Sequence, residues 1–138
     1  RLQSPSTSNP TSISQAAAVE ALNGDNSFIA ERAKVFKGRR DFLINELNSM
    51  NGITCRVPEG AFYVFPSCKG VIGKIDESNN KISNDEEFTT SLLEHAGVAV
   101  VQGSAFGLEG YFRISYATSD ENLKNACVRM RDFLNKLR

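Results

Sequence analysis

The chain has 138 residues, enough for one domain of ordinary size with its own core. Its 16 basic and 16 acidic residues balance, so its charge favours neither nucleic acid nor an anionic membrane, and no apolar run approaches the length of a membrane span. The three cysteines are too few and too scattered for a disulfide framework, and the lack of a Cys-x-x-Cys pair argues against metal binding and dithiol chemistry. A reducing cytoplasm is the simplest compartment. The chain opens at Arg1 without a methionine or a signal-like segment, so we expect it to belong to a longer polypeptide.

The first stretch is polar and rich in Ser and Thr, which predicts an extended arm over residues 1–9. The pair Asn9-Pro10 is typical of a helix start, with Asn as the N-cap and Pro in the first turn. An alanine-rich helix follows and is predicted to end at Asn23-Gly24.

A second, longer helix is predicted to start after Asp25-Asn26-Ser27 and to run to about Met50, ended by Asn51-Gly52. Its apolar residues form a single stripe over about six turns. The stripe comprises Phe28, Ile29, Val35, Phe36, Phe42, Leu43, Leu47 and Met50. Such a long helix with one stripe suggests a strut between two bodies of structure.

Short strands and two more helices are predicted in the remaining chain. Aromatic and β-branched residues predict strands over 53–57, 61–65 and 98–101. The glycines and polar residues over 69–84 predict a loop. A helix is expected from about Asp85 to Ala96, capped by Ser83 or Asn84, and a last one from the Ser119 cap, where acids suit the helix dipole. The sequence therefore predicts an α/β body of short strands with covering helices.

An arginine stands inside the strand predicted over 111–117. The alternation of a strand puts the apolar residues on one face and Arg113 on the other, among small and polar neighbours. The apolar face comprises Phe112, Ile114 and Tyr116, and the other Tyr111, Arg113, Ser115 and Ala117. Two interpretations follow: Arg113 binds a carboxylate through a two-pronged hydrogen-bonded pair, or it simply faces solvent.

Several apparent motifs fail on inspection. The stretch 70–74 imitates a phosphate loop but lacks its first Gly and its Ser or Thr, and residues 76–87 have calcium-loop spacing but Lys81 at the turn position. His95 is the only histidine and is expected to meet a helix dipole, and no triad can be assembled around Ser104. We therefore expect no metal site and no catalytic residue in this chain, with the chemistry elsewhere in a longer polypeptide.

Four segments, over residues 6–10, 60–65, 97–107 and 111–119, resemble the C-terminal third of the class I/II aminotransferases, which use pyridoxal phosphate. The resemblance is strongest to bacterial aspartate aminotransferases and covers essentially the whole chain. It implies the C-terminal small domain of a fold-type I transferase, with a short, mostly antiparallel sheet, covering helices and a long interdomain helix. Residues 1–24 would be an arm and helix on the large-domain side, and 25–138 the long helix and small α/β domain.

The resemblance also implies roles for individual residues. Arg113 matches the arginine that binds the substrate's α-carboxylate, in agreement with the strand-face argument. Ser8 and Asn9 match positions that approach the neighbouring subunit's coenzyme and active site in the family's homodimer. Ser4 stands where one branch of the family has an arginine that reads the substrate's distal carboxylate, so this chain does not show what reads that group.

The implied activity is amino-group transfer between aspartate, or a related amino acid, and 2-oxoglutarate in the cytoplasm. The motif that holds the family's coenzyme-binding lysine is absent, as are the main coenzyme ligands. We therefore expect the isolated chain neither to hold pyridoxal phosphate nor to transaminate. Two alternatives stay open: an aromatic or prephenate aminotransferase, and a non-catalytic α/β module that binds a small acid.

Overall fold

The structure is a computed structural model that describes residues 8–138. The chain divides into two compact units, an N-terminal unit that extends to Lys34 and a C-terminal unit over Val35–Arg138. Their boundary falls inside a long helix, α3 (Ser27–Asn48). The predicted division after residue 24 stays a prediction.

The N-terminal unit contains helix α2 (Ser12–Asn23) and the first turns of α3. The prediction that Asn9 caps α2 is wrong. Thr11, also a good capping residue, stands closer to the alanine-rich run, and its side-chain oxygen accepts from the Ser14 N–H at 3.3 Å. The predicted end of the helix is confirmed, since the Gly24 N–H donates to the Glu20 carbonyl. No residue of α2 is buried within the described chain.

A three-stranded sheet forms the centre of the C-terminal unit. The strands are β1 (Tyr63–Val64), β2 (Val101–Gln102) and β3 (Phe112–Ser115), in the order β1-β3-β2 with both pairs antiparallel. A 3₁₀ helix, η1 (Gly103–Phe106), follows β2 directly. The prediction of a short antiparallel sheet with covering helices is confirmed.

The strands are shorter than predicted, and the strand expected over 53–57 is reduced to one bridge, from Thr54 to Ser67. The reason is a side chain that takes the backbone's hydrogen bonds. Asn48 accepts from the Cys55 N–H at 2.8 Å and donates to the Cys55 carbonyl at 3.0 Å. A backbone satisfied in this way has no need of a partner strand.

Helices α4 (Asp85–Ala96) and α5 (Asp120–Lys136) begin where the sequence predicts. The side chain of Asn84 accepts from the Glu87 N–H at 2.8 Å, while the Glu87 carboxylate accepts from the Ser83 N–H at 2.6 Å. This reciprocal arrangement satisfies two N–H groups at the helix start. The Ser119 cap of α5 is confirmed as well.

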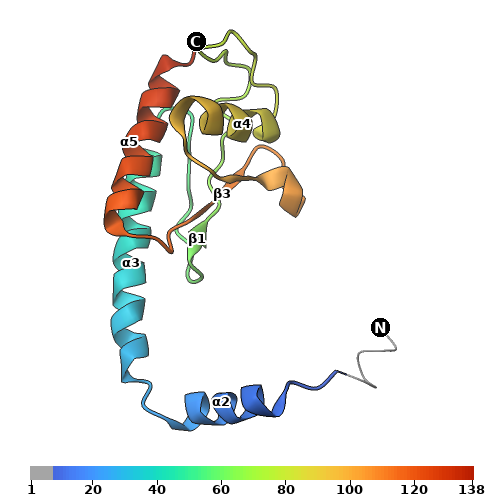
Figure 1. The fold of residues 1–138 in the computed structure, drawn as a ribbon. Helices are drawn as coiled ribbons and strands as arrows, with labels where there is room; N and C mark the ends of the chain where they lie inside the picture. The colour runs from blue at the N-terminus through green and yellow to red at the C-terminus, as the bar shows by residue number, and fades with distance from the viewer. Residues whose placement is uncertain (1–7) are drawn as a thin grey trace. The chain divides into compact units, whose positions relative to one another are not determined.

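The core lies on one face of the sheet, beneath the helices. Phe112 of β3 contacts Phe88 of α4 at 5.1 Å between ring centroids, and Phe88 contacts Phe133 of α5 at 6.3 Å. Figure 1 shows α5 beside the last turns of α3, and Arg131 of α5 is paired with Glu46 of α3 at 2.6 Å. These contacts connect β3 to α4, α4 to α5, and α5 to α3.

The apolar stripe of α3 is buried only near its C-terminal end, at Leu43, Ile44 and Leu47. Phe28, Ile29 and Val35 belong to the predicted stripe but are exposed within the described chain. The burial of Ile44 was not predicted. Among residues 8–138, no helix is both long and apolar enough to cross a membrane.

Two adjacent leucines of α4 give a direct test of this core. Leu92 is fully buried, whereas Leu93 is 52% exposed. We expect Leu92→Ala to lower the free energy of unfolding by about 2–5 kcal/mol through lost burial and a cavity. The matched control Leu93→Ala should change it by less than about 1 kcal/mol. Urea unfolding of both variants measures the difference, and equal losses would contradict this packing.

Candidate functional site

Arg113 lies in the middle strand of the sheet, on the face opposite the core. Its strand neighbour Phe112 is fully buried in the core, while Arg113 is partly buried and Ser115 is exposed. The alternation predicted for this strand is therefore present. Among the described residues, no carboxylate oxygen lies within 4.0 Å of the Arg113 guanidinium.

Two aromatic rings support the guanidinium instead. The Cζ atom of Arg113 lies 4.6 Å from the centroid of the Phe106 ring and 5.4 Å from that of the Tyr63 ring. Each such cation–π contact stabilises by roughly 0.5–2 kcal/mol. Ring faces do not use up the planar fork of N–H donors as a carboxylate would. We call this arrangement of Tyr63, Phe106 and Arg113 the arginine cradle, and it leaves the guanidinium able to receive an anion.

More aromatic side chains continue from the cradle along the sheet. Phe65 contacts Phe106 edge-on at 5.8 Å and stacks on Tyr111 at 6.0 Å, and the Lys69 ammonium lies 5.1 Å from the Tyr111 ring. Phe65, Leu108 and Tyr111 line a mainly apolar groove of about 460 Å³ with Arg56 at its side. The cradle thus adjoins a hollow of the surface, although Arg113 does not line it.

A glycine-rich turn over residues 103–110 carries Phe106 to the cradle. A side chain at Gly103 would place its Cβ 2.3 Å from the Leu108 carbonyl oxygen, so only glycine fits there. Gly107 and Gly110 have φ values of 77° and 75°, which also favour glycine. The Gly103 N–H donates to the Tyr111 carbonyl at 2.7 Å and closes the turn.

The sequence reasoning missed the role of Asp85, which was predicted only as a helix start. Its side chain is buried, and its two oxygens accept from the backbone N–H groups of Ser104 at 2.8 Å and Gly110 at 3.2 Å. Burial by itself would raise the pKa of Asp85, but these donors outweigh it and hold the pKa below its ordinary value. An acid in a first helical turn is common, so nothing in the sequence distinguished this one.

Two other predicted site residues belong to the N-terminal unit. Ser8 and Asn9 are exposed and belong to the N-terminal unit, so their approach to an active site stays a prediction. Ser4 lies outside the described residues.

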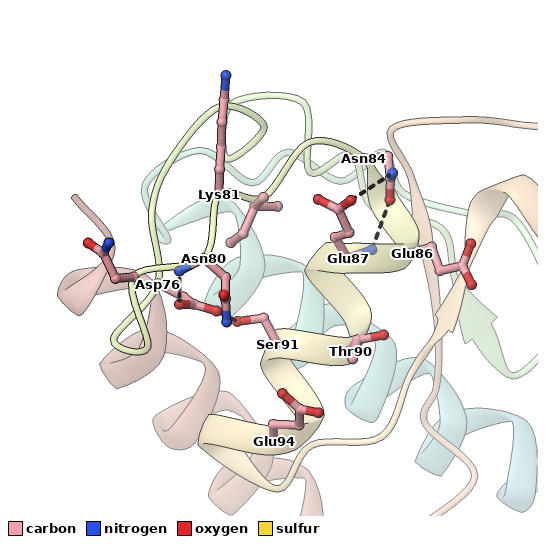
Figure 2. Close-up of a pocket in the computed structure, with 11 residues that line it drawn as sticks. Asp76, Asn80, Lys81, Asn84, Glu86, Glu87, Thr90, Ser91 and Glu94 are labelled. Carbon is pink, nitrogen blue, oxygen red and sulfur yellow. Dashed lines mark hydrogen bonds between the residues drawn. The ribbon is translucent and has the colours of Figure 1, made fainter.

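A second hollow, of about 660 Å³, lies between α4 and the loop before it. Figure 2 shows the carboxylates of Glu87 and Glu94 on α4, with Asp76 on the facing loop. Lys81 is the only basic residue in its lining. A carboxylate substrate would meet repulsion here, so the acidic hollow is a poor candidate for the site that Arg113 marks.

The buried Asp76 organises that loop. Its carboxylate accepts from the backbone N–H groups of Asn80 and Ser78, both at 2.9 Å, and from the Ser91 hydroxyl at 2.9 Å. These bonds, that of Asn80 foremost, lower the pKa of Asp76. His95 in the last turn of α4 lies 3.5 Å from the same carboxylate, so it meets a side chain as well as the helix dipole.

The cysteines are poor nucleophiles in this structure. Burial raises the pKa of Cys55 and Cys127 to about 11 and that of Cys68 to about 12, where the charge of Asp85 adds to the effect. All three thiols are therefore protonated near neutral pH. Within residues 8–138, no cluster of three His, Cys, Asp or Glu side chains is arranged to hold a metal ion.

Residues 1–130 match the family model described as aminotransferase class I and II. The chain belongs to this family. The resemblance inferred from the sequence is confirmed, and the family implies that the whole protein uses pyridoxal phosphate.

Relatives and solved structures of this aminotransferase family align with nearly the whole chain. The chain is 59% identical over 132 residues to a probable aspartate/prephenate aminotransferase of Rhizobium leguminosarum bv. phaseoli, covering 96% of the chain and 33% of the relative. The crystal structure of an aspartate aminotransferase from Rhizobium meliloti superposes with a TM-score of 0.93 at 53% identity, covering 99% and 34%. An aspartate aminotransferase from Thermotoga maritima gives 0.77 at 40% identity, covering 97% and 31%.

The chain thus spans about a third of the length of the relatives that it matches. These structures confirm the predicted fold class, that of the fold-type I aminotransferases.

Three lysines of the described residues already have partners. Covalent binding needs a lysine able to reach the coenzyme's aldehyde, and the phosphate needs cationic or N–H donors. Lys37 is paired with Asp41 at 3.3 Å, Lys136 with Glu77 at 3.1 Å, and Lys69 lies over Tyr111. These three lysines are therefore poor candidates for covalent binding of the coenzyme.

The buried carboxylate of Asp76 makes the free energy of unfolding depend on pH. The ordinary pKa of Asp76 is near 3.8 and its folded-state pKa is lower, so the unfolded state binds more protons in this range. The stabilisation is complete above about pH 5 and is lost as pH falls through the folded-state pKa. Urea unfolding between pH 7 and pH 3 should show this loss, with a shallower acid dependence in Asp76→Asn. The exposed Asp132→Asn is the control, and identical slopes in the two variants would contradict the assignment.

Proposed function

We propose that the protein containing this chain transfers an amino group between aspartate, or a related amino acid, and 2-oxoglutarate with pyridoxal phosphate as coenzyme. Family membership supports the reaction class, and the names of the relatives support aspartate. Because the chain spans about a third of those relatives, the activity belongs to the longer protein. Its cytoplasmic location and homodimeric state are part of the same proposal.

In this proposal Arg113 binds the α-carboxylate of the amino acid. The observation that carries it is the arginine cradle: a partly buried guanidinium between Tyr63 and Phe106, with no carboxylate of the described residues within 4.0 Å. Guanidinium and carboxylate match in shape, and two parallel N–H···O bonds fix the angle as well as the position of the ligand. Arg113 would therefore contribute to binding and to the orientation of the substrate.

Prephenate is a second candidate substrate, because some relatives are named aspartate/prephenate aminotransferases. Both substrates carry a carboxylate that the same guanidinium would hold, so Arg113 does not choose between them. A non-catalytic acid-binding module has less support, since family membership favours an enzyme. The roles of Ser8 and Asn9 near a neighbouring subunit's active site are retained as part of the proposal.

Substitution of Arg113 in the full-length protein tests its role. We expect Arg113→Ala to raise KM for aspartate and lower kcat, with kcat/KM reduced at least ~100-fold, because two charge-assisted hydrogen bonds are lost. Arg113→Lys should also be impaired, since an ammonium cannot make the two-pronged pair. Arg129→Ala, which removes an exposed arginine of α5, is the control. Steady-state kinetics with aspartate and with prephenate would measure KM and kcat of each variant. Unchanged constants in Arg113→Ala would contradict a role of Arg113 in carboxylate binding.

The 138-residue chain on its own is expected to be inactive. It lacks the motif of the coenzyme-binding lysine. Incubation with pyridoxal phosphate, aspartate and 2-oxoglutarate should give no turnover above the coenzyme alone. Turnover that depends on 2-oxoglutarate would show that the catalytic groups lie in this part of the protein.

A further inference from the structure

We infer that Asp85 is a positioning residue for Arg113, which acts by fixing the turn that brings Phe106 against the guanidinium. This inference rests on the proposed role of Arg113 as a carboxylate-binding residue. It adds a residue that does not touch the substrate but determines where the binding group stands.

The first step is the grip of Asp85 on the turn. One carboxylate oxygen accepts from the Ser104 N–H near the start of the turn, and the other accepts from the Gly110 N–H at its end. Asp85 is only 2% exposed, so water cannot easily replace either bond. A single buried carboxylate therefore fixes both ends of the 103–110 turn.

The second step leads from the turn to the guanidinium. Phe106 is the last residue of η1, and its ring lies 4.6 Å from the Arg113 Cζ atom. Phe106 is 50% exposed, so core packing alone does not hold its ring in place. Its backbone position comes from the turn, and the turn is bound to Asp85.

The third step is that the turn would change its conformation without Asp85. Its internal bonds run from the Leu108 N–H to the Gly103 carbonyl and from the Gly107 N–H to the Ser104 carbonyl, and the Gly103 N–H donates to the Tyr111 carbonyl just beyond it. Gly107 and Gly110 give the backbone between them wide conformational freedom. Without the carboxylate, two partly buried N–H groups would lose their acceptor, and the turn would rearrange to satisfy them.

Asp85→Asn is the direct test. An amide oxygen accepts from one N–H, but the amide nitrogen is itself a donor and faces the other N–H. Glu86→Gln is a matched control, because it neutralises the next residue in the same helical turn, and that residue is exposed.

The readout is the Nε–H signal of Arg113 in the ¹⁵N-arginine-labelled 138-residue chain, assigned by its loss in Arg113→Lys. Aromatic rings shift the signals of atoms over their faces, so the signal reports the position of Phe106. We expect Asp85→Asn to move the signal and Glu86→Gln to leave it in place. In the full-length protein, Asp85→Asn should weaken the binding of succinate, a dicarboxylate without an amino group, by on the order of tenfold. An unmoved signal and unchanged succinate affinity would overturn the inference.

A second variant decides the matter if Asp85→Asn fails to fold. Phe106→Leu removes the ring through which Asp85 is argued to act, and Phe62→Leu removes a similarly exposed ring that contacts Tyr63. Phe106→Leu should shift the Arg113 signal and weaken succinate binding, while Phe62→Leu should have the smaller effect; the reverse order would overturn the inference. If Arg113→Lys itself leaves succinate affinity unchanged, the proposed function fails instead.

Discussion

The candidate site depends on the contact of the Arg113 guanidinium with the rings of Tyr63 and Phe106, on the sheet face opposite the core. A partly buried guanidinium is costly unless it has partners, and here Phe106 and Tyr63 provide them without neutralising its charge. An internal carboxylate would have stabilised Arg113 equally well, but it would have occupied the donors that a ligand needs. If Arg113 binds a carboxylate as proposed, this aromatic support would keep its N–H donors available for that ligand.

The strands that carry Arg113 and Tyr63 are short, so the sheet alone does little to fix the backbone at the candidate site. With two to four residues each, the strands offer few ladder hydrogen bonds, so side chains fix much of the backbone. Asn48 holds Cys55, Asp76 holds the loop before α4, and Asp85 holds the turn before β3. In each case a polar side chain satisfies backbone groups that a longer sheet would have paired. Asp85 is the first residue of α4, and Asp76 accepts a hydrogen bond from Ser91 of the same helix, so both segments are fixed to α4.

The sequence indicated the fold class, the face of β3 on which Arg113 lies and two helix caps for identifiable physical reasons. Alternation along β3 separated Arg113 from Phe112, and Ser119 and Asn84 are capping residues whose chemistry is local. Long-range pairing was harder to predict, because the strand expected over 53–57 loses its bonds to Asn48, a residue of the preceding helix. The partners of Arg113 and the role of Asp85 were missed for the same reason: each depends on residues far apart in the chain.

The central claim is that the fork of Arg113 receives the carboxylate of an amino acid. The most direct measurement is a crystal structure of the full-length protein with bound aspartate or a non-reactive analogue. This account predicts two nearly parallel N–H···O contacts of about 2.8 Å between the guanidinium and one carboxylate, with the rings of Tyr63 and Phe106 still beside the arginine. A ligand carboxylate bound elsewhere, with Arg113 turned to solvent, would contradict it.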